Sequence, residues 1–153
     1  MKVYRICAEK YADDLMGTGA YMFGGRWNEK EYYMLYTAAH ISLATLEILV
    51  NLSYQHSFIK TKYSLLTLEL PDENFFELPL QQLPRYWKEN EWMTNKLGTE
   101  FLREGIYLYQ KVPSAIIEEE HNILINPKHP LFKKVKVLKR QPFNFDKRLL
   151  NKQ

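Results

Sequence analysis

One carboxylate, Glu47, lies inside a long apolar run, LYTAAHISLATLEILV at residues 35–50. If this part of the chain is helical, its neighbours one turn away include Leu43, Ala44 and Val50, all apolar. A carboxylate in such surroundings is at least partly desolvated, which costs free energy unless another group pairs with it. Because charged groups at such positions commonly serve a function, Glu47 is the first candidate for a site.

A second candidate, Arg26, directly follows two glycines, Gly24 and Gly25. Paired glycines allow the backbone to turn tightly or a ligand to come close. A guanidinium placed there can bind a phosphate or a carboxylate through two parallel hydrogen bonds. On spacing alone, a hairpin turn in which Arg26 stacks on Trp27 is the favoured interpretation.

Four further polar side chains stand in apolar segments, and each also has an ordinary structural role. Tyr36 at a strand end could bond to a ligand or stack on it, although such tyrosines more often fill a core. Ser114 follows Pro113 outside any nucleophile motif, so capping of the bend is its ordinary role. Asn122 and Asn126 would share one side of a strand, where they could read a carboxamide or merely fasten loops.

Several kinds of site are not expected. The four histidines have no metal-ligand spacing and no paired cysteines occur, so we expect no metal site. No Rossmann or Walker glycine-rich loop occurs, so we expect no resident dinucleotide cofactor. The single cysteine, Cys7, excludes an intramolecular disulfide and suits a reducing compartment. We expect it to be a small apolar residue of the first strand.

Length and composition fit one soluble domain that spans residues 1–153. The chain opens without a signal peptide and has no stretch near the ~20 apolar residues of a membrane span, so we expect a cytoplasmic protein. The net charge of +3 is too small to indicate nucleic-acid binding. The basic residues are nevertheless concentrated near the end, with eight lysines or arginines in residues 133–152.

The elements that must position these side chains are short and mixed. Strands are predicted at residues 3–7, 33–37, 58–70, 122–126 and 134–138. A helix is predicted at 42–51, an irregular segment at 11–24, and one or two helices divided by Gly98 at 87–103. Residues 107–117 read as a strand pair or one bent strand. Strands and helices mix without regular β-α-β alternation, which favours an α+β fold.

Together, the motifs resemble the RES domain, a family named for its Arg, Glu and Ser. They lie at residues 3–6 (VYRI), 25–28 (GRWN), 35–38 (LYTA), 42–47 (SLATLE), 112–115 (VPSA), 122–130 (NILINPKHP) and 145–149 (FDKRL). Their order and spacing cover almost the whole chain. The resemblance implies a fold like that of ADP-ribosyltransferase toxins, with a mixed β-sheet core and flanking helices.

The same resemblance implies a toxin of a toxin–antitoxin pair that degrades cellular NAD, which is its substrate and not a cofactor. The implied partner is a small helix-turn-helix antitoxin of the Xre type, and the complex could contain a toxin homodimer. By position, the residues implied as catalytic are Arg26, Tyr36 and Glu47, and those implied as substrate-binding are Arg26, Tyr36, Ser114, Asn122 and, close by, Arg5.

Three other functions share part of this evidence. Transfer of ADP-ribose to a protein uses the same site and differs only in the acceptor, which is water or phosphate in NAD degradation. A nucleic-acid binder could use the basic segment, but the alternation at residues 134–138 (KVKVL) favours a strand with one wet face. An inert interaction module would use the polar residues only to fasten loops.

Overall fold

A computed structural model of the chain describes residues 1–52 and 60–150. The strands are β1 (Lys2–Ala8), β2 (Leu35–Ala38), β3 (Tyr63–Glu69), β4 (Phe75–Glu77), β5 (Tyr109–Pro113), β6 (His121–Ile125) and β7 (Lys136–Phe143). The α-helices are α1 (Thr18–Phe23), α2 (Ile41–Leu52), α3 (Glu91–Glu104) and α4 (Lys147–Leu150), and the 3-10 turns are η1 (Glu9–Tyr11), η3 (Leu80–Gln82) and η4 (Pro130–Lys134).

The strands form one seven-stranded sheet in the order β4-β5-β6-β2-β1-β3-β7. β4 and β5 run parallel, and the other neighbouring strands run antiparallel. The sheet is therefore mixed, with helices packed around it, and the predicted α+β class is confirmed. Within the described ranges, none of the helices has the length and apolar character needed to cross a bilayer.

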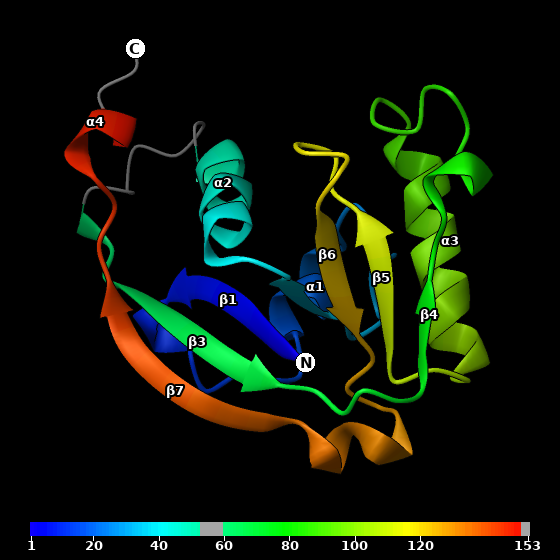
Figure 1. Ribbon diagram of the computed structural model, residues 1–153, viewed down its shortest axis with the longest axis horizontal. Helices are drawn as coiled ribbons and strands as arrows, with labels where there is room; N and C mark the ends of the chain where they lie inside the picture. The colour runs from blue at the N-terminus through cyan, green and yellow to red at the C-terminus, as the bar shows by residue number, and fades with distance from the viewer. Residues whose placement is uncertain (53–59, 151–153) are drawn as a thin grey trace.

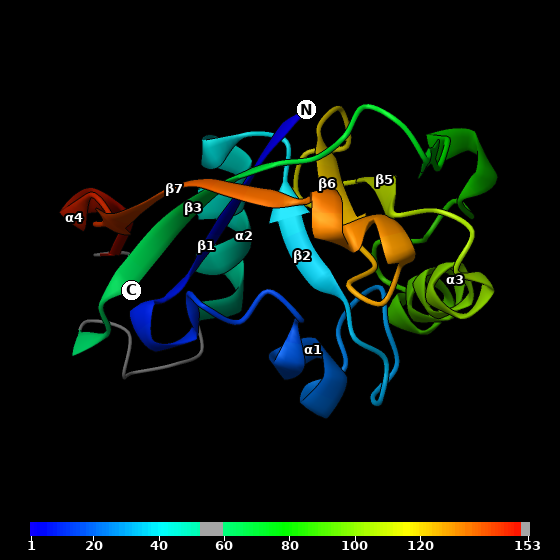
Figure 2. The same cartoon turned by 90° about the horizontal axis from the view of Figure 1, so that it is seen from below.

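The sheet is weakly joined in its middle. β1 and β3 pair along seven residues, from Lys2 to Ala8, whereas β1 and β2 meet only where Tyr4 lies opposite Ala38. Figure 1 shows the two arms of the sheet, β4-β5-β6-β2 and β1-β3-β7, diverging with α2 between them. Seen from below in Figure 2, α3 lies beyond one end of the sheet and α4 beyond the other. The junction of β1 and β2 is therefore a natural place for an opening.

Apolar side chains alternate along the strands and pack on both faces of the sheet. One face carries a single cluster that includes Val3, Leu35, Leu66 and Ile123. The other face carries two separate clusters. One of them contains residues of α2 and includes Ile6, Leu43 and Leu65. The other contains Phe101 of α3 and also includes Trp27 and Leu124. Full burial of one such side chain stabilises the fold by about 1.5–3 kcal/mol. The two clusters on the second face do not merge, and the cavity described below lies between α2 and α3 on that face.

Most predicted elements are confirmed to within a few residues. The strands expected at 3–7, 33–37 and 122–126 are β1, β2 and β6, and the helix expected at 42–51 is α2. The strand expected at 58–70 is observed as Tyr63–Glu69, while residues 58 and 59 lie outside the described ranges. Cys7 is buried in β1, as expected, and this burial raises the pKa of its thiol.

Two expectations are corrected, at residues 11–24 and 134–138, and two open alternatives are decided, at residues 107–117 and at Gly98. Residues 11–24 are not wholly irregular, because they include α1. Of the two alternatives for residues 107–117, a strand pair or one bent strand, one strand is observed, and it covers only Tyr109–Pro113. Gly98 does not divide two helices, because α3 continues through it. The strand expected at 134–138 is β7, which is longer, begins at Lys136, and is an edge strand exposed on both faces along most of its length.

Candidate active site

A cavity of about 980 Å³ opens between α2 and α3 on the face that carries the two apolar clusters. Its wall combines the loop of residues 24–30 with side chains from α2, α3, β2 and β6. Four of the predicted site residues line it, namely Arg26, Tyr36, Glu47 and Asn122. The fold thus brings together residues that are far apart in the sequence.

Glu47 occupies the cavity side of α2 and is half-buried. Its Oε1 accepts hydrogen bonds from Ser114 Oγ at 3.0 Å and from Asn122 Nδ2 at 2.6 Å. Among the described residues, no group bonds to its other oxygen. The helix neighbour Leu43 is fully buried, but Val50 is 52% exposed, so the surroundings are less apolar than the sequence pattern predicts. One oxygen is therefore fixed and the other is available to a ligand.

Ser114 is fully buried and does not line the cavity. Its Oγ donates to Glu47 and accepts from the backbone nitrogens of Ile116 and Ile117, at 3.0 and 3.3 Å. The expected capping of the bend is thus present, and the same hydroxyl also holds the carboxylate. Ser114 reaches the cavity only through Glu47.

The two asparagines of the β6 segment separate. Asn122 lines the cavity and donates to Glu47. Asn126 lies just past the end of β6, where its Oδ1 accepts from the backbone nitrogen of Lys128 at 3.0 Å. The expectation of a shared face fails because the strand stops one residue before Asn126, which fastens the following turn instead.

The glycine pair forms the expected tight turn. Gly24 has a φ of +71°, a region that favours glycine, and Gly25 pairs with Asn28 in an isolated antiparallel bridge. Trp27 is buried and packs against Trp87, with ring centroids 6.1 Å apart. The indole of Trp27 therefore anchors the turn in the core, and the side chain of Arg26, one residue earlier, lines the cavity.

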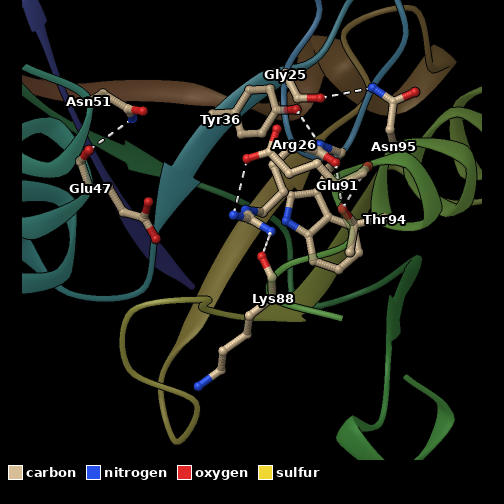
Figure 3. A network of polar contacts seen from close by, with 10 residues as sticks. Gly25, Arg26, Tyr36, Glu47, Asn51, Lys88, Glu91, Thr94 and Asn95 are labelled. Atoms are coloured by element: carbon tan, nitrogen blue, oxygen red, sulfur yellow. Dashed lines mark hydrogen bonds and ion pairs between the residues drawn. The ribbon is translucent and has the colours of Figure 1, made fainter. Parts of the chain in front are cut away.

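Arg26 does not form the contact that spacing alone favours. Its Nη1 donates to the carbonyl oxygen of Lys88 at 2.9 Å, and its Nη2 donates to Glu91 Oε1 at 3.2 Å. Figure 3 shows the guanidinium extended between these two acceptors, with Glu47 on the facing helix. The cation and the carboxylate thus lie on different sides of one cavity.

The Tyr36 hydroxyl is fully used within the protein. It donates to Asn28 Oδ1 at 2.7 Å and accepts from the Trp27 backbone nitrogen at 3.0 Å. Burial raises its pKa well above the ordinary value. A Cβ at Gly25 would lie 2.7 Å from this oxygen, so the close packing requires glycine there. Tyr36 therefore supports the loop with its hydroxyl and offers the cavity its ring.

Sequence reasoning did not assign a role to Asn28, which is fully buried at the centre of the loop. Its Nδ2 donates to the carbonyl oxygens of Ala20, Glu29 and Tyr32, at 2.9, 2.9 and 3.1 Å. Its Oδ1 accepts from Tyr36. One amide thus bonds to two carbonyls of the irregular segment, at Glu29 and Tyr32, and ties that segment to Ala20 of α1.

Sequence reasoning also missed the residues of α3 that hold the loop. Thr94 Oγ1 donates to the carbonyl oxygen of Arg26 at 2.8 Å. Asn95 Nδ2 donates to the carbonyl oxygens of Gly25 and Asn28, at 2.9 and 2.5 Å. Figure 3 shows both side chains reaching from the helix to the turn. The backbone on either side of the guanidinium is therefore anchored to α3.

One turn further along α3, the helix backbone itself touches the loop. A Cβ at Gly98 would lie 1.8 Å from the carbonyl oxygen of Trp27, so only glycine permits this approach. Thr99 Oγ1 accepts from the backbone nitrogen of Glu29 at 2.9 Å, and Lys96 forms an ion pair with the Glu29 side chain. We refer to the loop-facing residues Glu91, Thr94, Asn95, Gly98 and Thr99 as the α3 stripe. Their spacing of three and four residues is a signal that could have revealed it.

Arg5 is not part of the large cavity. It lies in β1 and donates to the carbonyl oxygens of Asp14 and Tyr11, at 2.8 and 3.4 Å. It lines a smaller cavity of about 190 Å³ at the junction of β1 and β2, below α2. The two cavities share the lining residues Tyr36, Glu47, Asn51 and Asn122. Arg5 therefore lies next to the candidate site, in a cavity that shares Glu47 with it.

The cavity wall carries both signs of charge. Its charged lining residues are the cations Arg26, Lys30 and Lys88 and the anions Glu29, Glu47 and Glu91, of which Glu91 is paired with Arg26. Within residues 1–52 and 60–150, no cluster of three or more His, Cys, Asp or Glu side chains could hold a metal ion. This arrangement can bind a ligand that has a cationic end and an anionic end.

Several known proteins are similar to this chain in sequence. A family model described as the RES domain matches residues 2–146. A Toxin Res of Yersinia enterocolitica is 36% identical over 153 residues, which cover 97% of this chain and 99% of the relative. A Toxin Res of Photorhabdus laumondii is 32% identical, with 98% and 97% covered. A protein of Sphingobium sp. called Prs ADP-ribosylating toxin is 34% identical, with 92% and 89% covered.

The fold is also similar to that of a solved structure. A chain in the crystal structure of the M. tuberculosis MbcT–MbcA toxin–antitoxin complex superposes with a TM-score of 0.74 at 17% identity, covering 94% of this chain and 84% of that one. At this identity the likeness concerns the fold alone. The family match, in contrast, spans nearly the whole sequence and agrees with relatives above 30% identity. This chain therefore belongs to the RES domain family.

Proposed function

We propose that this chain is the toxin of a toxin–antitoxin pair and that it cleaves the bond between nicotinamide and ribose in NAD. The observation that carries the proposal is the placement of Glu47 and Arg26 around one cavity, with one carboxylate oxygen held by Ser114 and Asn122 and no bond to the other from any described residue. A cavity of about 980 Å³ is large enough for a dinucleotide. Family membership and the toxin names of the relatives support the biological role.

The reaction asks little of a general acid. The nicotinamide nitrogen carries a positive charge while bonded to ribose, and it leaves with the bonding electron pair as a neutral base. The transition state has positive charge on the ribose, as in other glycosidic cleavages. A preorganised carboxylate stabilises that charge, and partial burial strengthens the effect. Glu47 is suited to this task because Ser114 and Asn122 hold it in place.

Other site residues would each bind a different part of NAD. Arg26 would bind the pyrophosphate, which is the anionic part of NAD. The Tyr36 ring would stack at the nicotinamide–ribose end, and Asn122 would orient a ribose hydroxyl or the carboxamide. Ser114 would act through Glu47, because it is buried behind it. NAD is the substrate in this scheme, so the reaction needs no resident cofactor.

The acceptor completes the reaction. Water would bond to the ribose carbon, lose a proton to solvent and give ADP-ribose. Phosphate would give ADP-ribose-1″-phosphate in the same way. Incubating the purified protein with NAD, with and without inorganic phosphate, and identifying the product by mass spectrometry distinguishes the two acceptors.

Expression of the chain alone in a bacterium tests the proposal. Cellular NAD should fall and growth should stop with the wild-type chain. Neither effect should occur with Glu47→Gln. A matched control is Glu119→Gln, which removes an exposed carboxylate and should remain toxic. Unchanged NAD on expression of the wild-type chain would refute NAD degradation.

A second candidate function is transfer of ADP-ribose to a protein target. The Sphingobium relative, 34% identical and called an ADP-ribosylating toxin, favours it. The site would be the same, with a nucleophilic protein side chain taking the place of water. Incubation with NAD and cell extract separates the two. Free nicotinamide without modified peptides supports degradation, and peptides that carry ADP-ribose support transfer.

The proposed partner is an Xre-type antitoxin in the cytoplasm, where NAD is available. The fold neighbour was solved in a toxin–antitoxin complex. An antitoxin must block the cavity, and exposed apolar side chains such as Phe23 and Val50 line it. Loss of ADP-ribose binding in the complex would support this arrangement.

The basic segment of residues 133–152 is a weaker candidate for binding nucleic acid. Two of its cations are already neutralised, because Lys134 and Arg140 form ion pairs with Glu73 and Asp13.

A further inference from the structure

The Arg26 guanidinium is already occupied by a carboxylate in this structure. Nη2 donates to Glu91 Oε1 at 3.2 Å, while Nη1 donates to the Lys88 carbonyl oxygen at 2.9 Å. Glu91 is the first residue of α3, and its side chain is 68% exposed. An exposed ion pair of this kind contributes little free energy and can be exchanged readily. The carbonyl belongs to the backbone, so Glu91 is the partner that can be replaced.

The position of Arg26 does not depend on this ion pair alone. Thr94 and Asn95 bond to the carbonyl oxygens of Arg26 and Gly25, and Gly98 lets α3 pack directly on the loop. Removing the charge of Glu91 would leave these anchors in place. The Glu91 side chain therefore acts on the binding edge of the guanidinium and has no part in anchoring the loop backbone.

We propose that Glu91 sets the affinity of the site for the phosphates of its substrate by competing with them for Arg26. This inference rests on the proposed function, which places a pyrophosphate at Arg26. A guanidinium binds phosphate best through two parallel N–H donors, and Glu91 occupies one of its nitrogens. A phosphate that arrives must displace the carboxylate, or two anions would stand side by side. Glu91 thus weakens binding of substrate and of the ADP-ribose product.

The affinity for ADP-ribose, measured by isothermal titration calorimetry, tests this competition. Glu91→Gln keeps the size of the side chain and removes its charge. It should bind ADP-ribose about two- to fivefold more tightly than the wild-type chain. The matched control is Glu89→Gln, which removes an exposed charge two residues away, where the described residues include no ion-pair partner. Its affinity should equal that of the wild type.

Two further measurements make the result specific. In the Arg26→Ala background, Glu91→Gln should give no gain, because the shared partner is gone. Nicotinamide, which has no phosphate, should bind Glu91→Gln and wild type equally. Equal or weaker ADP-ribose binding by Glu91→Gln overturns the competition, and weaker binding would mean that Glu91 only orients Arg26. A wild-type chain that binds no ADP-ribose refutes the proposed function as well.

Discussion

The two sides of the cavity are built on different principles. Glu47 stands on a regular helix, whose backbone satisfies its own hydrogen bonds, and two neighbouring side chains fix the carboxylate. Arg26 stands on an irregular loop, whose carbonyls accept hydrogen bonds from Asn28 and from Thr94 and Asn95 of α3. The comparison teaches that local helical structure positions the backbone of Glu47, whereas tertiary contacts position the backbone of Arg26. Substitutions on the two sides should therefore have different consequences.

The largest effect is expected from Glu47→Gln. The amide can still accept from Ser114 and Asn122, so the fold should be retained, but the charge that stabilises the ribose cation is lost. We expect kcat for nicotinamide release to fall about 100-fold or more, with a much smaller change in KM. Steady-state kinetics, with a melting curve to verify folding, measure this. Substantial turnover by a folded variant would remove Glu47 from its proposed role.

Arg26→Ala should act mainly on binding. The backbone anchors of the loop remain, but the charged hydrogen bonds to the pyrophosphate are lost, so kcat/KM should fall about 10- to 100-fold. The rise in KM should be at least as large as the fall in kcat. Arg26→Lys, which keeps the charge without the fork of donors, should be intermediate. If neither KM nor kcat changes, Arg26 lies outside the site.

Gly98→Ala should break the contact between α3 and the loop. The added methyl would overlap the Trp27 carbonyl oxygen, and the helix would have to shift, which should cost about 1–3 kcal/mol of unfolding free energy. Gly19→Ala is the matched control, because nothing lies within 4 Å of a Cβ there. It should be neutral or stabilising by up to about 1 kcal/mol. Equal urea midpoints for the two variants would contradict the close packing.

The smallest effect concerns alkaline stability and Tyr36. Because burial raises the pKa of its hydroxyl in the folded state, only the unfolded chain ionises this group as the pH rises past about 10. The free energy of unfolding should therefore decrease above that pH. The decrease should be smaller for Tyr36→Phe than for the wild-type chain. Burial raises the pKa of Tyr109 to about 12, so part of the loss should persist. Urea unfolding at pH 8 and 10.5 measures this difference, and identical losses would exclude a contribution from Tyr36.

The carboxylate side of the cavity could largely be predicted from the sequence. A charge at one position of an apolar helical pattern is visible in a short window, and it identified Glu47. The strand with Asn122 and the bend with Ser114 were also expected from local patterns. The bonds of both side chains to one oxygen of Glu47 could not be expected from local patterns. They join Glu47 to Ser114 and to Asn122, at sequence separations of 67 and 75.

The guanidinium side could not be predicted in the same way. Gly98 has the local properties of a helix breaker, and only the packing against Trp27 explains its place inside α3. Asn95 is an ordinary polar helix residue until its partner Gly25, 70 positions away, is known. The sheet order, in which β2 lies between β6 and β1, likewise depends on contacts that no local pattern encodes.

The central claim is that Glu47 and Arg26 hold different parts of one NAD molecule across the cavity. A crystal structure of the Glu47→Gln variant with NAD tests it most directly. We predict the nicotinamide ribose beside position 47 and the pyrophosphate within about 3.2 Å of the Arg26 guanidinium. NAD bound with its pyrophosphate away from Arg26, or with its ribose away from position 47, would contradict the claim.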